Sequence, residues 1–167
     1  VISLSGPSAE AIMQPLTSQP VNAADFPDMS WQAMDIAGVP ARVFRISFSG
    51  EAGYEINVPT RYGQAIWEKI WQQGQAFGCV AYGTESIHLL RAEMGFIIVG
   101  QDSDGTNTPL DLGMQWIVAS DKADFVGQRG LQRNVFSQSN RKQLVGLMPE
   151  DASQILPEGA QVVLPGA

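Results

Sequence analysis

Apolar and polar residues alternate most clearly between Tyr54 and Val58. A period of two is the pattern of a strand with one buried face. Residues 43–48 have a similar but less regular pattern, and the two glycines in residues 49–53 favour a turn between the two runs. The sequence therefore predicts a strand, a glycine turn and a second strand.

The rest of the first half of the chain also divides into short strands and helices. The spacing predicts a strand over residues 1–4, a helix over 7–16, a loop over 17–29, a strand over 31–36, a helix from residue 60 to about 74 or 77, and a helix over 85–94. Gly95 is predicted to end the last of these helices, since glycine readily adopts the left-handed conformation that follows a helix.

Two of these helices have an apolar face. On the helix over residues 60–77 that face consists of Ile66, Trp67, Ile70 and Trp71. On the helix over residues 85–94 it consists of Ile87, Leu90 and Met94. Each set is predicted to pack into the core, and the tryptophan pair is interpreted as core in preference to a ligand platform. His88 is predicted to be structural or solvated, and Arg91 and Glu93 are predicted to anchor the helix as ion pairs at the edge of the core.

Patterns in the second half of the chain are weaker. They predict a β-prone run at residues 96–99, an extended segment over 110–120 with Trp116 and Val118 buried, a short helix near 127–136, a strand over 141–148, and a turn and strand over 159–164. Helices and antiparallel-looking strands thus alternate without a βαβ repeat. This mixture favours the α+β class.

Composition narrows the possible functions. Of the 167 residues, 44% are hydrophobic and 16% are charged, which is typical of a soluble globular protein. The net charge of −7 without a basic cluster disfavours a nucleic-acid partner. No apolar run approaches the roughly 18 residues of a membrane helix, and no leader sequence is evident. A cytoplasmic setting is therefore expected, and the start at Val1 favours a fragment of a longer polypeptide.

The sequence gives little support for a metal site or a disulfide bond. The chain has one cysteine, Cys79, and one histidine, His88. Asp102 could start a calcium loop, but an EF-hand loop needs glycine at its sixth position and glutamate at its twelfth. Those positions hold Asn107 and Gly113. The segment is therefore predicted to be a polar turn that either lines a pocket or caps a helix.

Glu55 is the clearest candidate for ligand binding. It lies just past the glycine turn, on the strand face opposite Tyr54, and the aromatic Phe48 belongs to the same hairpin. A carboxylate in this position can receive a flat ligand that donates hydrogen bonds. The residues alone leave a second interpretation open, in which Glu55 is an ordinary solvated side chain.

Several motifs occur in the order of one known family. They are Leu4-Ser5-Gly6-Pro7, Ser-Gly-Glu-x-Gly-Tyr-Glu-Ile in the hairpin, Leu90-Arg91-Ala92-Glu93-Met94-Gly95, Gly100-Gln101-Asp102, Thr108-Pro109 and Phe125-Val126-Gly127. The chain resembles the folate-binding aminomethyltransferase family, which includes the glycine cleavage T-protein. Within that family the sequence is most similar to the carboxyl-terminal region of the α subunits of heterotetrameric sarcosine oxidases.

The resemblance implies a domain organisation and a set of partners. It implies the central part of an aminomethyltransferase-like folate-binding domain over residues 1–136, a linker over 137–141 and the start of a β-barrel domain over 142–167. It implies that folate and the other subunits of a hetero-oligomeric oxidase are partners. Flavins and NAD are implied only for the parent enzyme, outside this chain. Two alternatives stay open: a stand-alone tetrahydrofolate-dependent aminomethyltransferase or demethylase, and a non-catalytic scaffold.

The resemblance also implies roles for individual residues. Glu55 matches the family glutamate that contacts the pterin ring, and Phe48 and Phe96 match aromatic residues of the folate pocket. Ile87 stands where the T-protein carries an arginine used for folate, so those contacts are expected to differ here. The family's acidic residue near the reaction centre lies on a segment before Val1. No catalytic residue and no metal ligand is therefore assigned within the chain.

Overall fold

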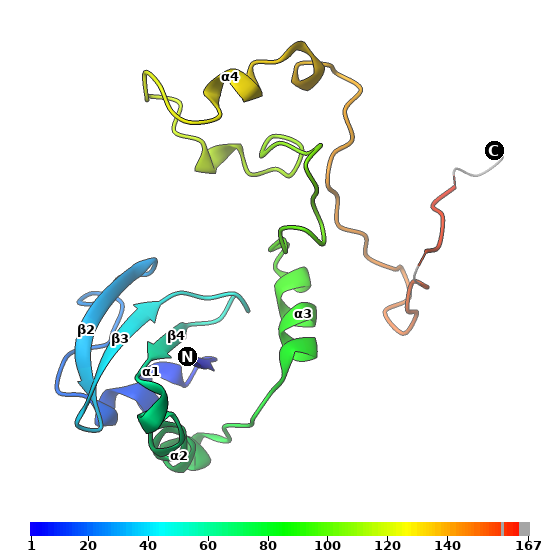
Figure 1. The fold of residues 1–167 in the computed structure, drawn as a ribbon. Helices are drawn as coiled ribbons and strands as arrows, with labels where there is room; N and C mark the ends of the chain where they lie inside the picture. Colours follow the sequence, from blue (N-terminus) through cyan, green and yellow to red (C-terminus); the bar gives the residue numbers. More distant parts are fainter. Residues whose placement is uncertain (158, 164–167) are drawn as a thin grey trace. The chain divides into compact units, whose positions relative to one another are not determined.

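A computed structural model describes residues 1–157 and 159–163 of the chain (Figure 1). The chain divides into two compact units, Val1–Ile97 and Ile98–Ala167. Each unit is described by itself below. No helix in the described part of the chain is both long enough and apolar enough to cross a membrane.

The first unit is built on one antiparallel sheet of four strands. The strands are β1 (Ile2–Ser5), β2 (Ser30–Ile36), β3 (Val39–Arg45) and β4 (Gly53–Asn57). They lie in the order β1-β4-β3-β2, and every neighbouring pair is antiparallel. All four predicted strands of this region are confirmed within a few residues. The predicted hairpin is the pair β3 and β4, and the class is α+β.

Helices cover one face of this sheet. Helix α1 (Ala9–Met13) continues into a 3-10 turn, Gln14–Leu16, and α2 (Gly63–Gly74) lies between two further 3-10 turns, Thr60–Tyr62 and Gln75–Phe77. The core that they form with the sheet consists mainly of Ile12, Met13, Ile66 and Ile70 from the helices and of Met34, Ile36, Val43, Tyr54 and Ile56 from the strands. The predicted helices 7–16 and 60–77 are confirmed as helix plus 3-10 turn.

The strand register separates a core face from a second face. Residues directly opposite each other in an antiparallel sheet project on the same side. One row on the second face runs across all four strands: Ser3, Glu55, Phe44 and Trp31. The rings of Phe44 and Trp31 lie 6.3 Å apart. This row is therefore polar on β1 and β4 and aromatic on β3 and β2.

The tryptophans of α2 depart from the prediction. Ile66 and Ile70 are buried as expected, but Trp67 is 46% exposed and Trp71 is 37% exposed. Their rings stack on each other, 6.4 Å apart and 7° from parallel. They lie on the flank of the apolar stripe, beyond the part of α2 that the sheet covers. The prediction that both belong to the core is wrong for the described residues.

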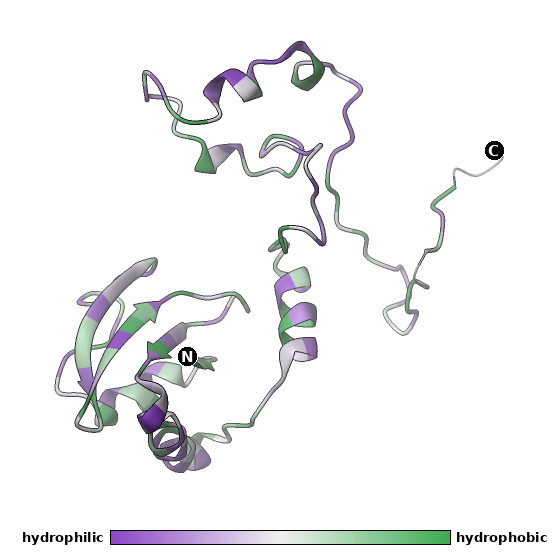
Figure 2. Ribbon diagram, viewed as in Figure 1, coloured by the Kyte–Doolittle hydropathy of each residue, from purple (hydrophilic) through white to green (hydrophobic). Residues whose placement is uncertain are grey.

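Helix α3 (Thr84–Glu93) also buries a different face from the predicted one. Figure 2 shows hydrophilic and hydrophobic residues alternating along it. Ile87 and Leu90 are half-buried, Met94 just past the helix is 51% exposed, and the buried residue of the helix is Arg91. The prediction of an apolar inward face is therefore wrong for Met94 and only partly met by Ile87 and Leu90.

The second unit contains short helical segments and turns. These are α4 (Gln128–Leu131) and the 3-10 turns Gln115–Ile117 and Asn134–Phe136. The runs predicted as extended at 96–99, 110–120 and 141–148 form no strand, although Val99 and Ser103 make one isolated bridge. Trp116, predicted to be buried, is 77% exposed. Such runs form strands only where another strand pairs with them. The predicted strand over 159–164 ends outside the described residues.

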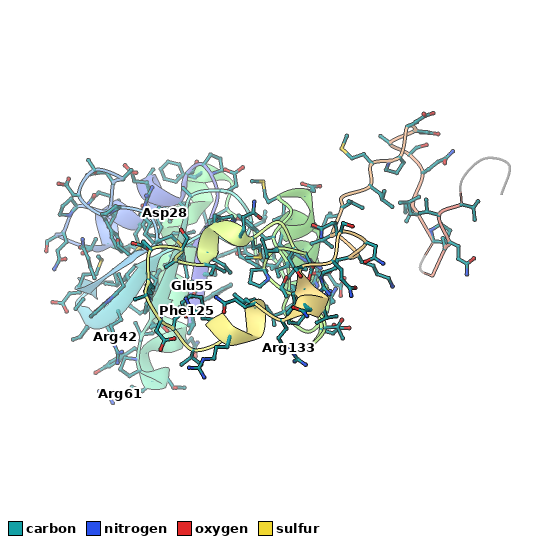
Figure 3. All side chains as sticks on the ribbon, turned by 90° about the horizontal axis from the view of Figure 1, so that it is seen from above. Asp28, Arg42, Glu55, Arg61, Phe125 and Arg133 are labelled. Carbon is teal, nitrogen blue, oxygen red and sulfur yellow. The ribbon has the colours of Figure 1, made fainter. Side chains whose placement is uncertain are left out.

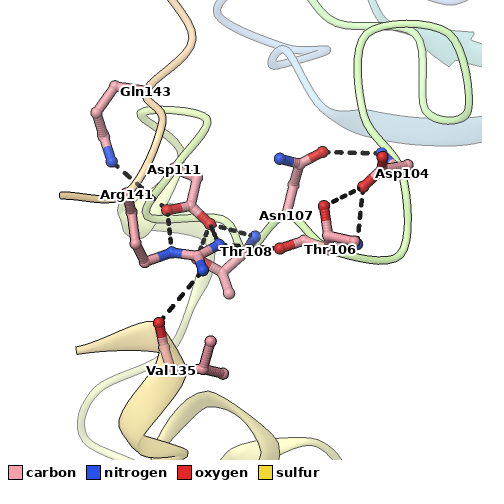
Figure 4. Close-up of polar contacts among 8 residues, drawn as sticks. All are labelled: Asp104, Thr106, Asn107, Thr108, Asp111, Val135, Arg141 and Gln143. Carbon is pink, nitrogen blue, oxygen red and sulfur yellow. Dashed lines mark hydrogen bonds and ion pairs between the residues drawn. The ribbon is translucent and has the colours of Figure 1, made fainter. Parts of the chain in front are cut away.

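One carboxylate organises the second unit (Figure 4). Asp111 is only 2% exposed and accepts hydrogen bonds from the backbone and hydroxyl of Thr108, at 2.8 and 2.9 Å. Arg141 donates from Nε at 2.7 Å and pairs with the carboxylate again through a second nitrogen. The Asp111 carbonyl accepts from the amide of Leu144 at 2.8 Å. A two-pronged contact between guanidinium and carboxylate thus ties together segments that are thirty residues apart in sequence.

Tyr54 links the sheet to the predicted loop over residues 17–29. Its side chain is fully buried in the core, where the hydroxyl donates to the Val21 carbonyl at 2.7 Å. Burial raises the pKa of the Tyr54 hydroxyl, so the donor stays protonated at neutral pH. The loop is therefore anchored from within the core.

We predict that Tyr54→Phe lowers the free energy of unfolding by about 1–3 kcal/mol, because the buried Val21 carbonyl loses its donor. Urea denaturation followed by circular dichroism measures the change. Tyr62→Phe, at a half-buried tyrosine, is the control and should cost less than about 0.5 kcal/mol. Equal costs in the two variants would refute the anchoring role.

A second prediction concerns acid. The hydrogen bonds from Arg141 hold the pKa of Asp111 well below its usual range. A carboxyl whose folded pKa lies below its unfolded value, about 3.9, stabilises the fold above that pH and loses this contribution as the pH falls through the folded pKa. Amide exchange protection at Thr108 and Leu144 should therefore decline below about pH 4. Asp111→Asn should have low protection at every pH, and wild-type protection in this variant would contradict the prediction.

Candidate functional site

Glu55 lies where the alternation predicts it, on the second face of the sheet. On β4 its buried neighbours Tyr54 and Ile56 project into the core, and Glu55 is half-buried on the opposite side. Directly opposite it are Ser3 of β1 and Phe44 of β3. Figure 3 labels Glu55 among the side chains of this unit. The carboxylate therefore stands between a hydroxyl and an aromatic ring, and away from the core.

Phe48 and Phe96 are brought together by the fold. Phe48 lies in the loop of residues 46–52 between β3 and β4, and Phe96 follows α3. Their rings are 6.1 Å apart and 12° from parallel. Phe48 is 40% exposed and Phe96 is 39% exposed. The pair is thus a partly open aromatic surface on which another flat ring can pack.

Glycine makes the approach of the hairpin loop to α3 possible. Gly50 has a φ of +86°, and a Cβ added to it would lie 2.5 Å from both Cγ and Sδ of Met94. At the base of the loop, a Cβ on Gly53 would lie 2.6 Å from the carbonyl oxygen of Ile46. The two glycines predicted as a turn therefore have separate roles. Gly53 closes the hairpin, and Gly50 lets Met94 pack against the loop.

Arg91 holds the backbone of Phe96 in place through two hydrogen bonds. Its Nη1 donates to the Phe96 carbonyl at 3.1 Å, and the Phe96 amide donates to the Arg91 carbonyl at 2.9 Å. Gly95, at φ +73°, turns the chain between them and confirms the predicted end of the helix. The structural role predicted for Arg91 thus takes the form of positioning an aromatic residue. The sequence analysis did not predict this contact. The pattern that could have indicated it is an arginine in the last turn of a helix that a glycine ends.

Buried hydroxyls accompany the aromatic pair. Ser49 is 7% exposed, and among the described residues no hydrogen-bond partner is found for the hydroxyl of Ser49 or for that of Ser47. Buried hydroxyls normally have partners. Tyr54, by contrast, belongs to the core and takes no part in this surface. The fold thus brings Phe48 and Phe96 together, and it places Glu55 on the second face of the sheet opposite Ser3 and Phe44.

The defining sequence pattern of the GCVT N-terminal domain matches residues 1–122. The chain belongs to this family. The match covers both the sheet and the turn after α3. This membership confirms the resemblance that the motifs indicated.

The chain is also similar to individual proteins of known name. It is 45% identical to the sarcosine oxidase subunit alpha of Corynebacterium sp. (strain P-1), over 99% of the chain and 17% of that protein. It is 35% identical to the sarcosine oxidase subunit alpha of Rhizobium meliloti (strain 1021), with the same coverage. It is 33% identical to an aminomethyltransferase of Flavobacterium psychrophilum, over 91% of the chain and 42% of that protein. The GCVT chain therefore spans only part of the length of these relatives.

We predict that Gly50→Ala destabilises the GCVT chain more than Gly38→Ala does. Both glycines have a positive φ, but a Cβ on Gly38 meets no atom within 4 Å. Each substitution therefore carries the conformational cost of about 1–2 kcal/mol, and Gly50→Ala adds about 1–3 kcal/mol for overpacking against Met94.

Urea denaturation of both variants, in the wild-type and the Met94→Ala background, measures these terms. Met94→Ala should remove the extra cost at Gly50 and leave the cost at Gly38 unchanged. If both glycine variants lose the same stability in the wild-type background, Met94 does not position the loop.

Proposed function

We propose that this chain is the folate-binding region of a sarcosine-oxidase-type α subunit. In this role it accepts the one-carbon unit from the oxidative demethylation of sarcosine and forms 5,10-methylenetetrahydrofolate. The 45% identity to a sarcosine oxidase subunit alpha over 99% of the chain supports this assignment. Flavin and NAD chemistry would belong to other parts of the enzyme.

The stacked pair of Phe48 and Phe96 is the observation that carries the proposal. The two residues come from segments far apart in the chain, yet the rings lie 6.1 Å apart with similar orientation. Both are partly exposed, so a ligand can reach the rings. Tetrahydrofolate offers a flat pterin ring of a size that such a surface can hold. The buried hydroxyl of Ser49 supplies a polar group on the same loop.

Glu55 is proposed as the anchor of the pterin edge. A pterin presents a ring N–H beside an exocyclic amino group, and a carboxylate accepts from both in a two-pronged contact. The half-buried position of Glu55 suits this role, since partial burial strengthens a charge-assisted bond. The side chain of Ser3, directly opposite in the sheet, is a further polar neighbour.

A stand-alone tetrahydrofolate-dependent aminomethyltransferase is the second candidate. The 33% identity to an aminomethyltransferase, of which the chain covers 42%, favours it. Ile87 argues against the T-protein itself, because an apolar, half-buried side chain stands where that protein is expected to carry an arginine. Formation of 5,10-methylenetetrahydrofolate from sarcosine, without a carrier protein, would separate the oxidase from the transferase.

We predict that Glu55→Ala weakens tetrahydrofolate binding to the full-length protein by about 1.5–3 kcal/mol, a factor of roughly 10 to 150, because a charge-assisted pair is lost. Isothermal titration calorimetry measures the affinity. Glu51→Ala, at an exposed glutamate of the same hairpin, is the matched control and should bind like wild type. Unchanged affinity in Glu55→Ala would exclude Glu55 as the anchor.

A further inference from the structure

Two buried hydroxyls flank Phe48 in the loop of residues 46–52. Ser49 is 7% exposed, and the hydroxyl oxygens of both Ser47 and Ser49 are shielded from solvent. Among the described residues, neither hydroxyl has a hydrogen-bond partner. A buried hydroxyl of this kind raises the free energy of the folded protein, because it gives up its bonds to water and gains none in exchange.

Other hydroxyls of the chain are paired. The Tyr54 hydroxyl, fully buried in the core, donates to the Val21 carbonyl at 2.7 Å. The hydroxyl of Thr108, which is 3% exposed, donates to the Asp111 carboxylate at 2.9 Å. In the described part of the chain, the buried hydroxyls that lack a partner thus both belong to one loop. That loop is the one that carries Phe48.

The unpaired hydroxyls are next to an open aromatic surface in the chain. Phe48 stacks on Phe96 with their ring centroids 6.1 Å apart, and both rings are partly exposed. A serine side chain turns about one bond among three staggered positions, and its hydroxyl can donate as well as accept. A turn of Ser49 can therefore offer a donor to a ligand that packs on Phe48, while the aromatic pair stays in place.

The chemistry of the two kinds of polar group defines the ligand that suits them. An ionised Glu55 only accepts hydrogen bonds, whereas a serine hydroxyl can donate one. A flat ring that carries both N–H groups and a carbonyl oxygen has a use for each. The pterin of tetrahydrofolate is such a ring, since a carbonyl lies beside the N–H groups that are proposed to bind Glu55.

We propose that Ser49 binds the ring carbonyl of tetrahydrofolate, and that its hydroxyl remains unpaired in the free protein at a cost in stability. Ser49 is favoured over Ser47 because Ser49 is buried, whereas Ser47 is half-buried. Binding residues often lower the stability of the free protein in this way. The identity of the ligand rests on the proposed function, but the unpaired hydroxyl does not.

Two measurements on the Ser49→Ala variant of the full-length protein test the proposal. Without ligand, hydrogen exchange at the amides of β4 should slow by about fivefold or more, because an unpaired buried hydroxyl has been removed. Tetrahydrofolate binding, measured by calorimetry, should weaken by about 3- to 10-fold, because one hydrogen bond to the ligand is lost. A hydroxyl with a structural role, such as one bridged by water, would give faster exchange. Exchange that does not slow, or an unchanged affinity, would overturn the proposal.

Ser5→Ala is the control for a paired hydroxyl, since the Ser5 hydroxyl lies 2.9 Å from that of Tyr82. It should speed exchange in β1 and leave the affinity for tetrahydrofolate unchanged. Phe48→Ala separates this inference from the proposed function. If Phe48→Ala weakens binding and Ser49→Ala does not, the role of Ser49 alone is refuted. If neither variant weakens binding, the aromatic pair is not the folate site and the proposed function fails as well.

Discussion

The one-sided burial of the sheet is the constraint on which the first unit depends. Tyr54 and Ile56 occupy the core, and the Tyr54 hydroxyl is held by the Val21 carbonyl. A shift of one residue in the register of β4 would turn Glu55 into the core and expose the tyrosine. The cost of burying an unpaired carboxylate excludes that arrangement. The burial of Tyr54 and Ile56 therefore fixes the register of β4, and this register places Glu55 on the opposite face of the sheet.

The aromatic part of the site depends on close contacts at the end of α3. Gly50 makes room for Met94, and Arg91 holds the Phe96 backbone from a buried position. These contacts fix both rings without burying them. A ligand that stacks on a surface already in place binds without the cost of ordering it. This arrangement gives a physical reason for a buried arginine in a helix whose other residues are half-buried or exposed.

The strands of the first unit and the face of Glu55 could be predicted because alternation reports directly on one-sided burial. The stacking of Phe48 on Phe96 could not, since nothing in the local pattern links a hairpin loop to a helix end. The tryptophans of α2 were wrongly assigned to the core because an apolar stripe shows which residues avoid water, and does not show which partner covers them. In the second unit, apolar runs such as 141–148 resemble strands, but they have no pairing partner among the described residues.

The second unit has a specific polar contact at its centre and little buried apolar surface among the described residues. Its buried described residues are Thr108 and Asp111, and no apolar side chain there is buried. The contact between Asp111 and Arg141 gives the segments a unique pairing, because a two-pronged contact accepts only one geometry. It does not supply the free energy of apolar burial that stabilises a domain. Large exposed side chains, including Trp116 and Val126, are available for that burial. The geometry of this unit therefore rests on a polar contact more than on apolar burial among the described residues.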